Sequence, residues 1–407
     1  MLNESTPAAQ TRREANRALT IVSAAVFLAS AVWFSGTAAA PALRAEWHLG
    51  DAQAAWLTTA VQLGFIAGTI IYSLLNLADR FNARRVFCVS ALVGASVNLA
   101  FALLADGIGA ACALRFLTGV TLAGVYPVGM KIVASWFREG LGWRLGVMVG
   151  ALALGTATPY LLRALGTSFD WRATIAGASA LATAGGLLLL FGVGDGPHLK
   201  ARARFDWRAA FKIFRHPSFR YTAFGYFGHM WELYAFWSLS TFYFAARFGD
   251  QATEWRGVAL LPLLSFATVG AGVVGCVAGG WVSRTAGERR VALVSLCVSG
   301  ACSALSGFAF ELRPELLLAF VLVWGVFVVS DSPQFSALAA RHCPPEYTGT
   351  ALTVQNGIGF AVTIFSIQLL PLLATVVGWR WAFTVLAGGP FVGAYFMWRL
   401  GRAGSTA

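Results

Sequence analysis

The stretch Leu75-Asn-Leu-Ala-Asp-Arg-Phe-Asn-Ala-Arg-Arg85 is a short basic loop between two long apolar segments. A similar loop, Gly279-Gly-Trp-Val-Ser-Arg-Thr-Ala-Gly-Glu-Arg-Arg290, lies between two apolar segments in the second half of the chain. Aligning Asp79 with Ser283 gives an offset of 204 residues, which is about half of the 407-residue chain. This offset predicts that the chain consists of two similar halves.

Two other pairs of residues support the same repeat. Pro127 and Pro333 lie at matching places in long apolar segments and are 206 residues apart. Trp171 and Trp379, each followed by an arginine, open the last apolar segment of each half and are 208 residues apart. A membrane chain built from two similar halves is typical of secondary transporters, whose substrate site lies between the halves.

The composition excludes a soluble protein. The chain is 57% hydrophobic and 12% charged, whereas a soluble domain is roughly 25% charged. The six cysteines are scattered without a CxxC pair, so we expect neither a disulfide framework nor a metal site. There is also no Walker loop and no nucleophile elbow. We therefore expect no cofactor and no enzymatic activity.

Twelve apolar segments are long enough to cross a bilayer, which takes about 20 residues. They cover residues 18–41, 53–77, 86–105, 109–135, 143–165, 172–194, 219–246, 257–282, 290–311, 314–340, 348–377 and 380–400. The sequence predicts an all-α integral membrane protein with two pseudo-symmetric six-helix bundles, at 18–194 and 219–400. The tail 1–17, the basic linker 195–218 and the tail 401–407 flank these bundles.

The distribution of positive charge predicts the orientation in the membrane. If the helices alternate in direction, 21 of the 30 lysines and arginines lie on the side of the amino terminus and 7 on the other side. The positive-inside rule places both termini and the linker in the cytoplasm, with the chain in a bacterial inner membrane. The net charge of +12 thus reflects membrane topology and does not indicate nucleic-acid binding. The apolar run after Arg12 and Arg13 is longer than usual for a cleaved signal peptide.

The first loop resembles the loop motif of the major facilitator superfamily, which has a glycine, an Asp-Arg pair, a second glycine and two basic residues. Asp79, Arg80, Arg84 and Arg85 match this motif, although Leu75 and Asn82 stand in place of the glycines. The second loop keeps two glycines and three arginines but has a serine where the acid belongs; its matching residues are Gly279, Ser283, Arg284, Gly287, Arg289 and Arg290.

Two shorter motifs extend this resemblance over the whole chain. Arg115-Phe-Leu-Thr-Gly119 is similar to the fourth-helix motif of the family, and Gly378-Trp-Arg-Trp-Ala-Phe383 is similar to the start of its twelfth helix. The resemblance implies two bundles around a central cavity, with helices 1, 4, 7 and 10 lining it and the halves rocking about it. It implies that the loop motif is a conformational latch, while simple membrane topology is the alternative for its basic residues.

The branch of the family is less certain from the motifs. Residues 123–131 and 229–234 look like an uncharacterised bacterial branch near the cyanate and nitrate permeases. Nitrate porters carry an arginine in helix 2 and another in helix 8, whereas residues 53–77 and 257–282 contain none. This difference argues against nitrate. The antiporter motif of helix 5 is degraded, which weakens an assignment to drug–proton antiport.

Ionisable groups inside the membrane are the first candidates for a functional site, because a charge there is costly. Arg115 in helix 4 is a candidate for binding an anion, with snorkelling to the interface as the alternative. Lys131 lies near the cytoplasmic end of the same helix, where a gating contact and snorkelling are equally plausible. Tyr126, beside Pro127, is a candidate for a kinked cavity wall. Trp33 in helix 1 either lines the cavity or faces lipid.

The second half contributes three ionisable candidates. His229 and Glu232 are three residues apart in helix 7, so we expect them to share a face and to form a proton-coupling site beside Trp231. A polar contact between bundles is the alternative. Asp331 precedes Pro333 in helix 10. It could pair with Arg115 or Lys131, carry a proton, or cap backbone groups at a proline kink.

These observations together predict a monomeric secondary transporter that moves a small organic or inorganic anion with a proton by alternating access. The mechanistic hypothesis is that protonation of Glu232, assisted by His229, changes the bundle equilibrium. Proton-driven efflux of amphiphilic compounds is the alternative, which the aromatic helix 7 would suit. A membrane sensor would need an output domain, and the cytoplasmic segments are too short for one.

Overall fold

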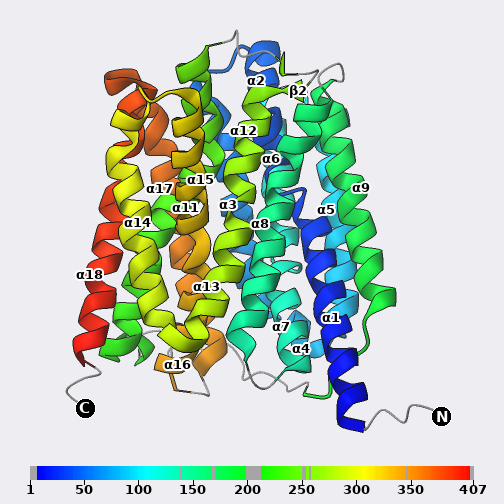
Figure 1. The fold of residues 1–407 in the computed structure, drawn as a ribbon. Coiled ribbons are helices and arrows are strands. Elements are labelled where there is room, and N and C mark those ends of the chain that lie inside the picture. The colour runs from blue at the N-terminus through cyan, green and yellow to red at the C-terminus, as the bar shows by residue number, and fades with distance from the viewer. Residues whose placement is uncertain are drawn as a thin grey trace, which may run out of the picture.

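The computed structural model describes residues 7–137, 140–166, 170–198, 212–249, 254–255, 258–344 and 347–403. Most of the expected linker, including Lys200, Arg202, Arg204 and Arg208, lies outside these residues. The long helices run side by side, and both ends of the chain leave from the same side of the molecule (Figure 1). We call this side the terminal face and the other side the opposite face.

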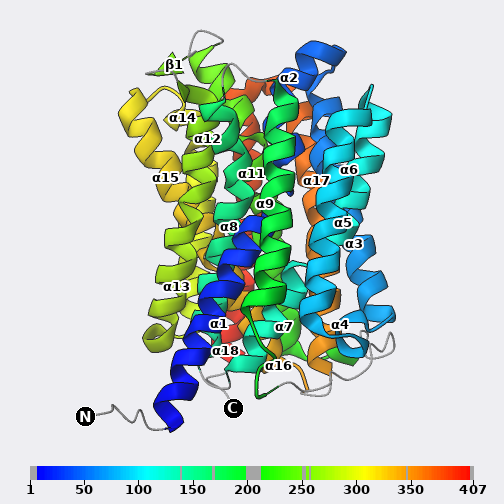
Figure 2. The ribbon, with the colours of Figure 1, turned by 90° about the vertical axis from the view of Figure 1, so that its right-hand side faces the viewer.

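The first half crosses between the two faces six times. Its elements are α1 (Pro7–Ser30), α2 (Ser35–Trp47), α3 (Asp51–Leu74), α4 (Leu77–Arg80), α5 (Ala83–Leu104), α6 (Ile108–Leu122), α7 (Tyr126–Trp136), α8 (Leu141–Leu165) and α9 (Trp171–Gly192). The first crossing consists of α1 and α2, the fourth consists of α6 and α7, and α4 is a single turn in the basic loop. Figure 2 shows α1 beside α9 on the outside of this half.

The second half repeats this path. Its elements are α11 (Pro217–Phe248), β1 (Glu254–Trp255), β2 (Val258–Ala259), α12 (Leu260–Gly270), α13 (Gly272–Ala286), α14 (Glu288–Ala309), α15 (Pro314–Ser330), α16 (Ser332–His342), α17 (Thr348–Ala382), η2 (Phe383–Ala387) and α18 (Gly388–Ala403). Strands β1 and β2 pair antiparallel in a small hairpin on the opposite face. Gly378, with a φ of 74°, divides α17 where the chain turns back.

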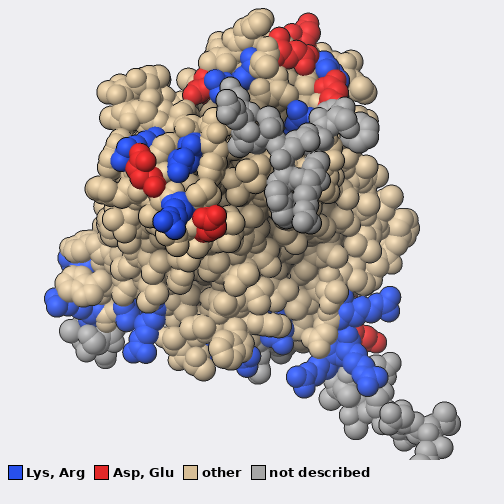
Figure 3. Space-filling view, turned by 45° about the horizontal axis from the view of Figure 1, so that its top comes forward, with Lys and Arg blue, Asp and Glu red and all other residues tan. Residues whose placement is uncertain are grey.

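The described residues contain ten stretches that are long and apolar enough to cross a membrane. The last of them, Thr348–Arg402, includes the turn at Gly378 and so crosses twice. Helix α11 is 32 residues long and completes twelve crossings. The predicted fold of two six-helix bundles is therefore confirmed. Figure 3 shows charged side chains at the two faces and a belt between them almost without charge.

The two prolines of the repeat have the same structural role. Pro127 is the second residue of α7 and Pro333 is the second residue of α16, and both helices are 11 residues long. Proline suits the first turn of a helix, where its missing N–H needs no partner, but it cannot continue a helix without a break. Each proline thus begins the second part of a broken membrane helix, as the repeat predicts.

The halves meet along two pairs of crossings. Helix α3 packs against α17, and α8 packs against α12 and α13. Small residues allow the close approach: a methyl group at Gly146 would lie 2.9 Å from the carbonyl oxygen of Cys276. Among the described residues, seven of the eight ion pairs form within one half, and the eighth joins Arg84 to Asp195 of the linker. No ion pair of the described chain therefore holds the halves together.

Candidate functional site

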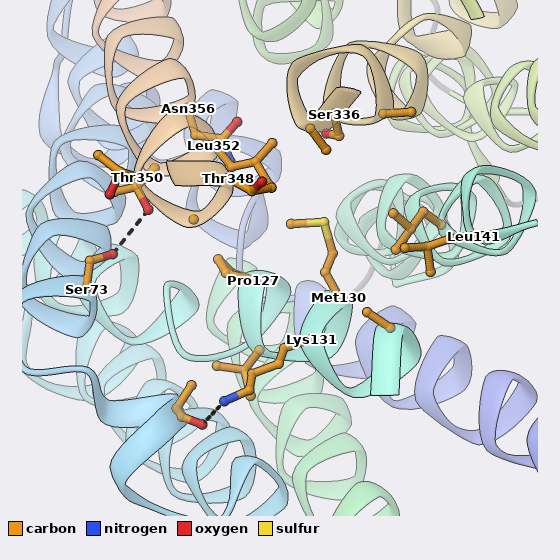
Figure 4. Close-up of a pocket in the computed structure, with 18 of the residues that line it drawn as sticks. Ser73, Pro127, Met130, Lys131, Leu141, Ser336, Thr348, Thr350, Leu352 and Asn356 are labelled. Atoms are coloured by element: carbon orange, nitrogen blue, oxygen red, sulfur yellow. Dashed lines mark hydrogen bonds between the residues drawn. The ribbon is translucent and has the colours of Figure 1, made fainter. Parts of the chain in front are cut away.

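A cavity of about 520 Å³ separates the two halves at the terminal face (Figure 4). The first half lines it with the ends of α3, α7 and α8, and the second half lines it with α16 and the start of α17. Hydroxyl and amide groups are frequent in its wall: Thr69, Tyr72, Ser73, Asn76, Ser336, Thr348, Thr350, Thr353 and Asn356. The hydroxyls of Ser73 and Thr353 lie 3.3 Å apart and form a contact between the halves. We call this space the central cavity.

Six aromatic side chains pack together between the halves, one helical turn beyond the cavity-lining residues Thr69 and Asn356. Three come from the first half and three from the second: Trp33, Phe34, Phe65, Tyr234, Trp237 and Phe360. All are at most 5% exposed. The ring centroids of Phe65 and Phe360 lie 4.4 Å apart, and those of Trp33 and Tyr234 lie 5.9 Å apart. Aromatic pairs at such distances pack tightly and exclude water. We call this cluster the aromatic plug.

Further contacts join the halves on the opposite side of the plug. The Gln368 amide donates a hydrogen bond to the Thr59 hydroxyl (2.7 Å), and the Trp379 indole donates to the Asp51 carboxylate (3.0 Å). The Arg44 guanidinium lies 5.3 Å from the centre of the Phe242 ring. The structure is therefore closed between the plug and the opposite face, and its central cavity lies between the plug and the terminal face.

Arg115 holds the break in the first membrane helix. Its side chain is fully buried and donates hydrogen bonds to the backbone carbonyls of Val32 (2.9 Å) and Trp33, which lie between α1 and α2. The last carbonyls of a helix have no partner within the helix, so a guanidinium can cap them. Arg115 is fully buried and so does not snorkel to an interface; it is not part of the lining of the central cavity, and its role toward an anion stays a prediction.

Polar side chains of neighbouring helices complete the Arg115 site. The Asn98 side-chain oxygen accepts from Arg115 (2.8 Å) and from the Ser35 hydroxyl (2.8 Å). The amide nitrogen of Asn98 donates to Ser179 (3.0 Å). The acceptors of the Arg115 hydrogen bonds are neutral oxygens, with no carboxylate among them. The first half therefore contains a buried positive charge that hydrogen bonds stabilise without neutralising it.

His229 pairs with Asp331 in the second half. The distance between His229 Nδ1 and Asp331 Oδ1 is 2.8 Å, and each side chain is 1% exposed. Asp331 lies at the junction of α15 and α16, two residues before Pro333. The sequence left Asp331 open to pairing with Arg115 or Lys131, and the structure gives it this different partner.

Glu232 points to a different neighbour from His229. Glu232 Oε1 accepts hydrogen bonds from the Ser303 hydroxyl (2.5 Å) and from the Trp324 indole (2.8 Å), and its side chain is also 1% exposed. Both donors belong to the second half, on α14 and α15. The structure gives His229 and Glu232 different partners on neighbouring helices, Asp331 for His229 and Ser303 with Trp324 for Glu232.

The end of α7 meets the first basic loop. Lys131 Nζ lies 2.6 Å from Asp79 Oδ1 and also donates to the carbonyl oxygen of Ala78. The Lys131 side chain is 9% exposed and that of Asp79 is 19% exposed. Lys131 therefore makes a contact between helix and loop, and it is the cation that the acid of the loop motif binds in this structure.

The second basic loop forms a similar contact with a different acid. Glu288 Oε1 lies 2.8 Å from Arg341 Nη2, at the end of α16. The sequence interpretation noted Ser283 as the missing acid and overlooked Glu288, five residues later. The residue was visible in the quoted loop, directly before Arg289, but the offset of 204 residues placed the acid elsewhere.

The other arginines of the loops are less enclosed. Arg84 pairs with Asp195 (3.0 Å), and Arg289 donates to the carbonyl oxygen of Met397 (3.3 Å). The remaining four side chains are exposed: Arg80, Arg85, Arg284 and Arg290.

Three aromatic candidates occupy different places. Trp33 belongs to the plug and is 1% exposed, so it does not face lipid. Tyr126 opens α7 and is half-buried beside Pro127, which lines the central cavity. The indole of Trp231 donates to the carbonyl oxygen of Val385 (3.4 Å), so this side chain packs toward η2 and away from the cavity.

Two buried glutamines were not recognised as site candidates from the sequence. The side chains of Gln334 and Gln355 are fully buried, and neither carboxamide has a hydrogen-bond partner among the described residues. Buried polar groups in native proteins are nearly always paired, so these two carboxamides are further candidates for binding a polar solute. Gln334 follows Asp331 by one turn of α16. Of the described residues, no three His, Cys, Asp or Glu side chains form a group that could hold a metal ion.

Comparison with known proteins identifies the relatives of the chain. The sequence profile of the Major Facilitator Superfamily matches residues 22–367 and 263–406. The putative niacin/nicotinamide transporter NiaP of Bacillus subtilis is 25% identical over 312 residues, which covers 72% of this chain and 74% of that protein. The probable galactarate/D-glucarate transporter GudP of Escherichia coli is 24% identical over 135 residues, which covers 31% of this chain and 29% of that protein.

Solved structures share the fold. A mutant of the nucleoside transporter NupG superimposes with a TM-score of 0.71 at 13% identity and covers 94% of this chain and 98% of that one. The human organic anion transporter MFSD10 (TETRAN) superimposes with a TM-score of 0.69 at 14% identity and covers 94% and 99%. At such identities the likeness concerns the arrangement of the helices alone.

Proposed function

This chain belongs to the major facilitator superfamily, and from that premise we propose that it carries a small organic anion across the bacterial inner membrane together with a proton. Its family and its relatives are membrane transporters, so it is a membrane transporter of a small solute and not an enzyme. The anionic cargo, the proton and the orientation are the parts that we propose.

Three observations support an anionic cargo. The relatives are named for niacin and nicotinamide and for galactarate and D-glucarate; of these, niacin and the two sugar acids carry carboxyl groups, and nicotinamide is a neutral amide. Arg115 is fully buried and binds only neutral oxygens among its hydrogen-bond partners, so its charge makes the electrostatic potential of the first half positive. The hydroxyl and amide groups of the central cavity suit a small polar solute better than an amphiphilic drug.

The transport cycle would require the opposite side to open. The excess of lysine and arginine on the terminal face favours a cytoplasmic location for that face, so the central cavity would face the cytoplasm. The plug and the two hydrogen bonds beyond it, Gln368 to Thr59 and Trp379 to Asp51, would then separate in the outward-facing state.

The buried pair of His229 and Asp331 is the observation that carries the proton hypothesis. Both groups lie inside the second half, where burying an ionisable side chain is costly, so such side chains are usually functional. Asp331 also lies at the break before α16, and α16 lines the central cavity through Ser336 and Arg341. A change of charge at this pair would therefore act on the part of the helix that forms the cavity wall.

We assign the proton-coupling role to the pair of His229 and Asp331 in place of Glu232. Glu232 is held by Ser303 and Trp324, and neither of these two side chains lines the central cavity. Asp331 and His229 lie on helices that pack against each other and against α17, whose start lines the cavity. Asp331 directly precedes α16, which lines the cavity, and this position supports a coupling role for the pair.

Uptake by purified protein in liposomes tests the proposed function. Radiolabelled nicotinate, which is an anion at pH 7, should accumulate when the outside is more acidic than the inside, and neutral nicotinamide should not. Protein-free liposomes at the same pH values correct for the neutral acid that crosses lipid directly. Equal uptake with and without the pH gradient, in liposomes that do transport the solute, would overturn the coupling, and equal accumulation of nicotinamide would overturn the anionic cargo.

A further inference from the structure

A second cavity of about 520 Å³ lies at the terminal face of the second half. The start of α11, the loop before α14, the end of α16 and the end of α18 form its wall. Its lining is mostly polar and basic: Ser218, Thr285, Ala286, Gly287, Glu288, Arg289, Arg290, Leu338, Arg341, His342, Leu400 and Gly401. We call it the arginine pocket. Every residue in this lining belongs to the second half, and two of them, Glu288 and Arg341, also line the central cavity.

The charge of the arginine pocket is positive. Three guanidinium groups line it, from Arg289, Arg290 and Arg341, whereas Glu288 is the one carboxylate in its lining. Glu288 pairs with Arg341 at 2.8 Å, and Arg289 uses one nitrogen to hold the carbonyl oxygen of Met397. Arg290 is exposed. At least two guanidinium groups thus have no carboxylate partner within the lining.

Neighbouring groups add neutral hydrogen-bond donors. The hydroxyls of Ser218 and Thr285 line the same pocket. Helix α14 begins in the pocket, where Gly287 has a φ of 83° and no side chain caps the first N–H groups of the helix. Guanidinium groups, hydroxyls and free backbone N–H groups are the donors that bind phosphate oxygens in proteins.

The pocket also lies at the edge of the apolar belt. Trp281 precedes Thr285 by one helical turn and is 63% exposed, and Trp398 precedes Gly401 and is 42% exposed. Exposed tryptophans of membrane proteins gather at the level of the lipid headgroups. We propose that the arginine pocket binds a phosphate group, presented either by the headgroup of an anionic phospholipid or by a free phosphate ion.

Binding at this pocket has a consequence for the central cavity. Glu288 and Arg341 line both cavities, so their ion pair forms the wall between them. A phosphate in the arginine pocket competes with Glu288 for Arg341, whose side chain is 63% exposed and free to turn. Occupancy therefore weakens the contact between the second loop and α16. The site itself does not depend on the proposed cargo or on proton coupling.

The test uses the full-length protein in nanodiscs of two compositions. Native mass spectrometry counts retained lipid in nanodiscs that contain phosphatidylglycerol, and thermal unfolding in phosphatidylcholine nanodiscs reports stabilisation by added inorganic phosphate. Retention of phosphatidylglycerol alone identifies the lipid as the ligand, and a phosphate-dependent rise in Tm identifies the free ion. Both results support the pocket; the absence of both would overturn it.

Matched variants locate the binding. The double substitution Arg289→Gln and Arg290→Gln should weaken phosphate or lipid binding at least about tenfold, because it removes two charged hydrogen-bond donors from the pocket. The control is Arg80→Gln with Arg85→Gln, which removes the same charge from the exposed side chains of the first loop. Arg290→Gln alone serves if the double variant fails to fold. Equal weakening by the control, or unchanged binding in Arg290→Gln and the double variant, would contradict the proposal.

Discussion

The first crossing of each half follows the same path but treats buried polar groups differently. In the first half the helix is broken at residues 31–34, and the open carbonyl groups accept hydrogen bonds from Arg115 of the fourth crossing. In the second half α11 is unbroken, and its ionisable residues His229 and Glu232 reach out to neighbouring helices. In the first half, Arg115 thus supplies hydrogen bonds to the backbone of a broken helix. In the second half, the unbroken helix α11 carries the titratable side chains.

The two halves therefore differ in whether their buried charge can change with pH. An arginine keeps its charge throughout the physiological pH range, so Arg115 gives the first half a constant positive potential. Histidine and carboxyl groups can gain or lose a proton in that range when their surroundings favour it. Under the proposed function, the first half would be the part of constant charge and the second half would be the part that responds to protons.

The largest expected effect is on stability and comes from substituting Arg115 in the first half. Arg115→Met should lower the free energy of unfolding by on the order of 4 kcal/mol, because the carbonyls of Val32 and Trp33 and the Asn98 amide lose a charged donor in a buried site. Thermal unfolding of the purified protein measures this loss. Arg115→Lys keeps the charge without the forked geometry and should recover only part of it. A Tm of Arg115→Met equal to that of the unmodified protein would contradict the capping role.

Substitutions of Glu232 test whether this carboxylate has a structural role, distinct from that of the pair His229 and Asp331. Glu232→Ala should cost about 3 kcal/mol, because it leaves the Ser303 hydroxyl and the Trp324 indole buried without an acceptor. Glu232→Gln keeps an oxygen for both donors and should cost less than about 1 kcal/mol. Unfolding and proton-driven uptake are measured on the same preparations. Loss of proton-driven uptake in Glu232→Gln would return the coupling role to this residue.

The ion pairs of the two basic loops, Asp79 with Lys131 and Glu288 with Arg341, allow the halves to be compared at the terminal face. Asp79 and Lys131 are 19% and 9% exposed, whereas Arg341 is 63% exposed. Exposed ion pairs contribute about 0–1 kcal/mol, and a more enclosed pair contributes more. Asp79→Asn should therefore change the transport rate about fivefold, the equivalent of about 1 kcal/mol, without loss of folding. Glu288→Gln is the matched variant and should change the rate less; a larger change than in Asp79→Asn would reverse this ranking.

The smallest expected effects concern contacts between the halves. Gln368→Leu removes the 2.7 Å hydrogen bond to Thr59 and should favour the outward-facing state by about 1 kcal/mol. Thr353→Val removes the longer contact with Ser73 near the terminal face and should shift the balance less, in the other direction. Spin-label distances between the terminal-face ends of α3 and α17 report both shifts. Shifts of the same sign would show that these contacts do not act as opposing gates.

Much of the fold is readable from the sequence. Apolar segments of about 20 residues determine the crossings, and proline forces the breaks before α7 and α16. The break at residues 31–34 contains no proline and no glycine, so its cause is not local. It depends on Arg115, which lies more than 80 residues later in the chain and supplies the hydrogen bonds that the broken helix lacks.

The partners of the site residues were harder to predict. Spacing along a helix says which residues share a face, but the rotation of that helix against its neighbours depends on packing across the bundle. His229 and Glu232 illustrate this, because a difference of about 60° is enough to give one residue Asp331 and the other Ser303 as partner. Glu288 was missed because the two loops differ in length between the acid and the helix end.

The most direct test of the division between the halves compares two kinds of transport by Asp331→Asn in the same liposomes. A pH difference of one unit should concentrate the solute about tenfold through the unmodified protein if one proton accompanies each anion. Asp331→Asn should not concentrate the solute, yet it should still exchange labelled for unlabelled solute at equal pH. Gradient-driven accumulation by Asp331→Asn at the level of the unmodified protein would contradict the account.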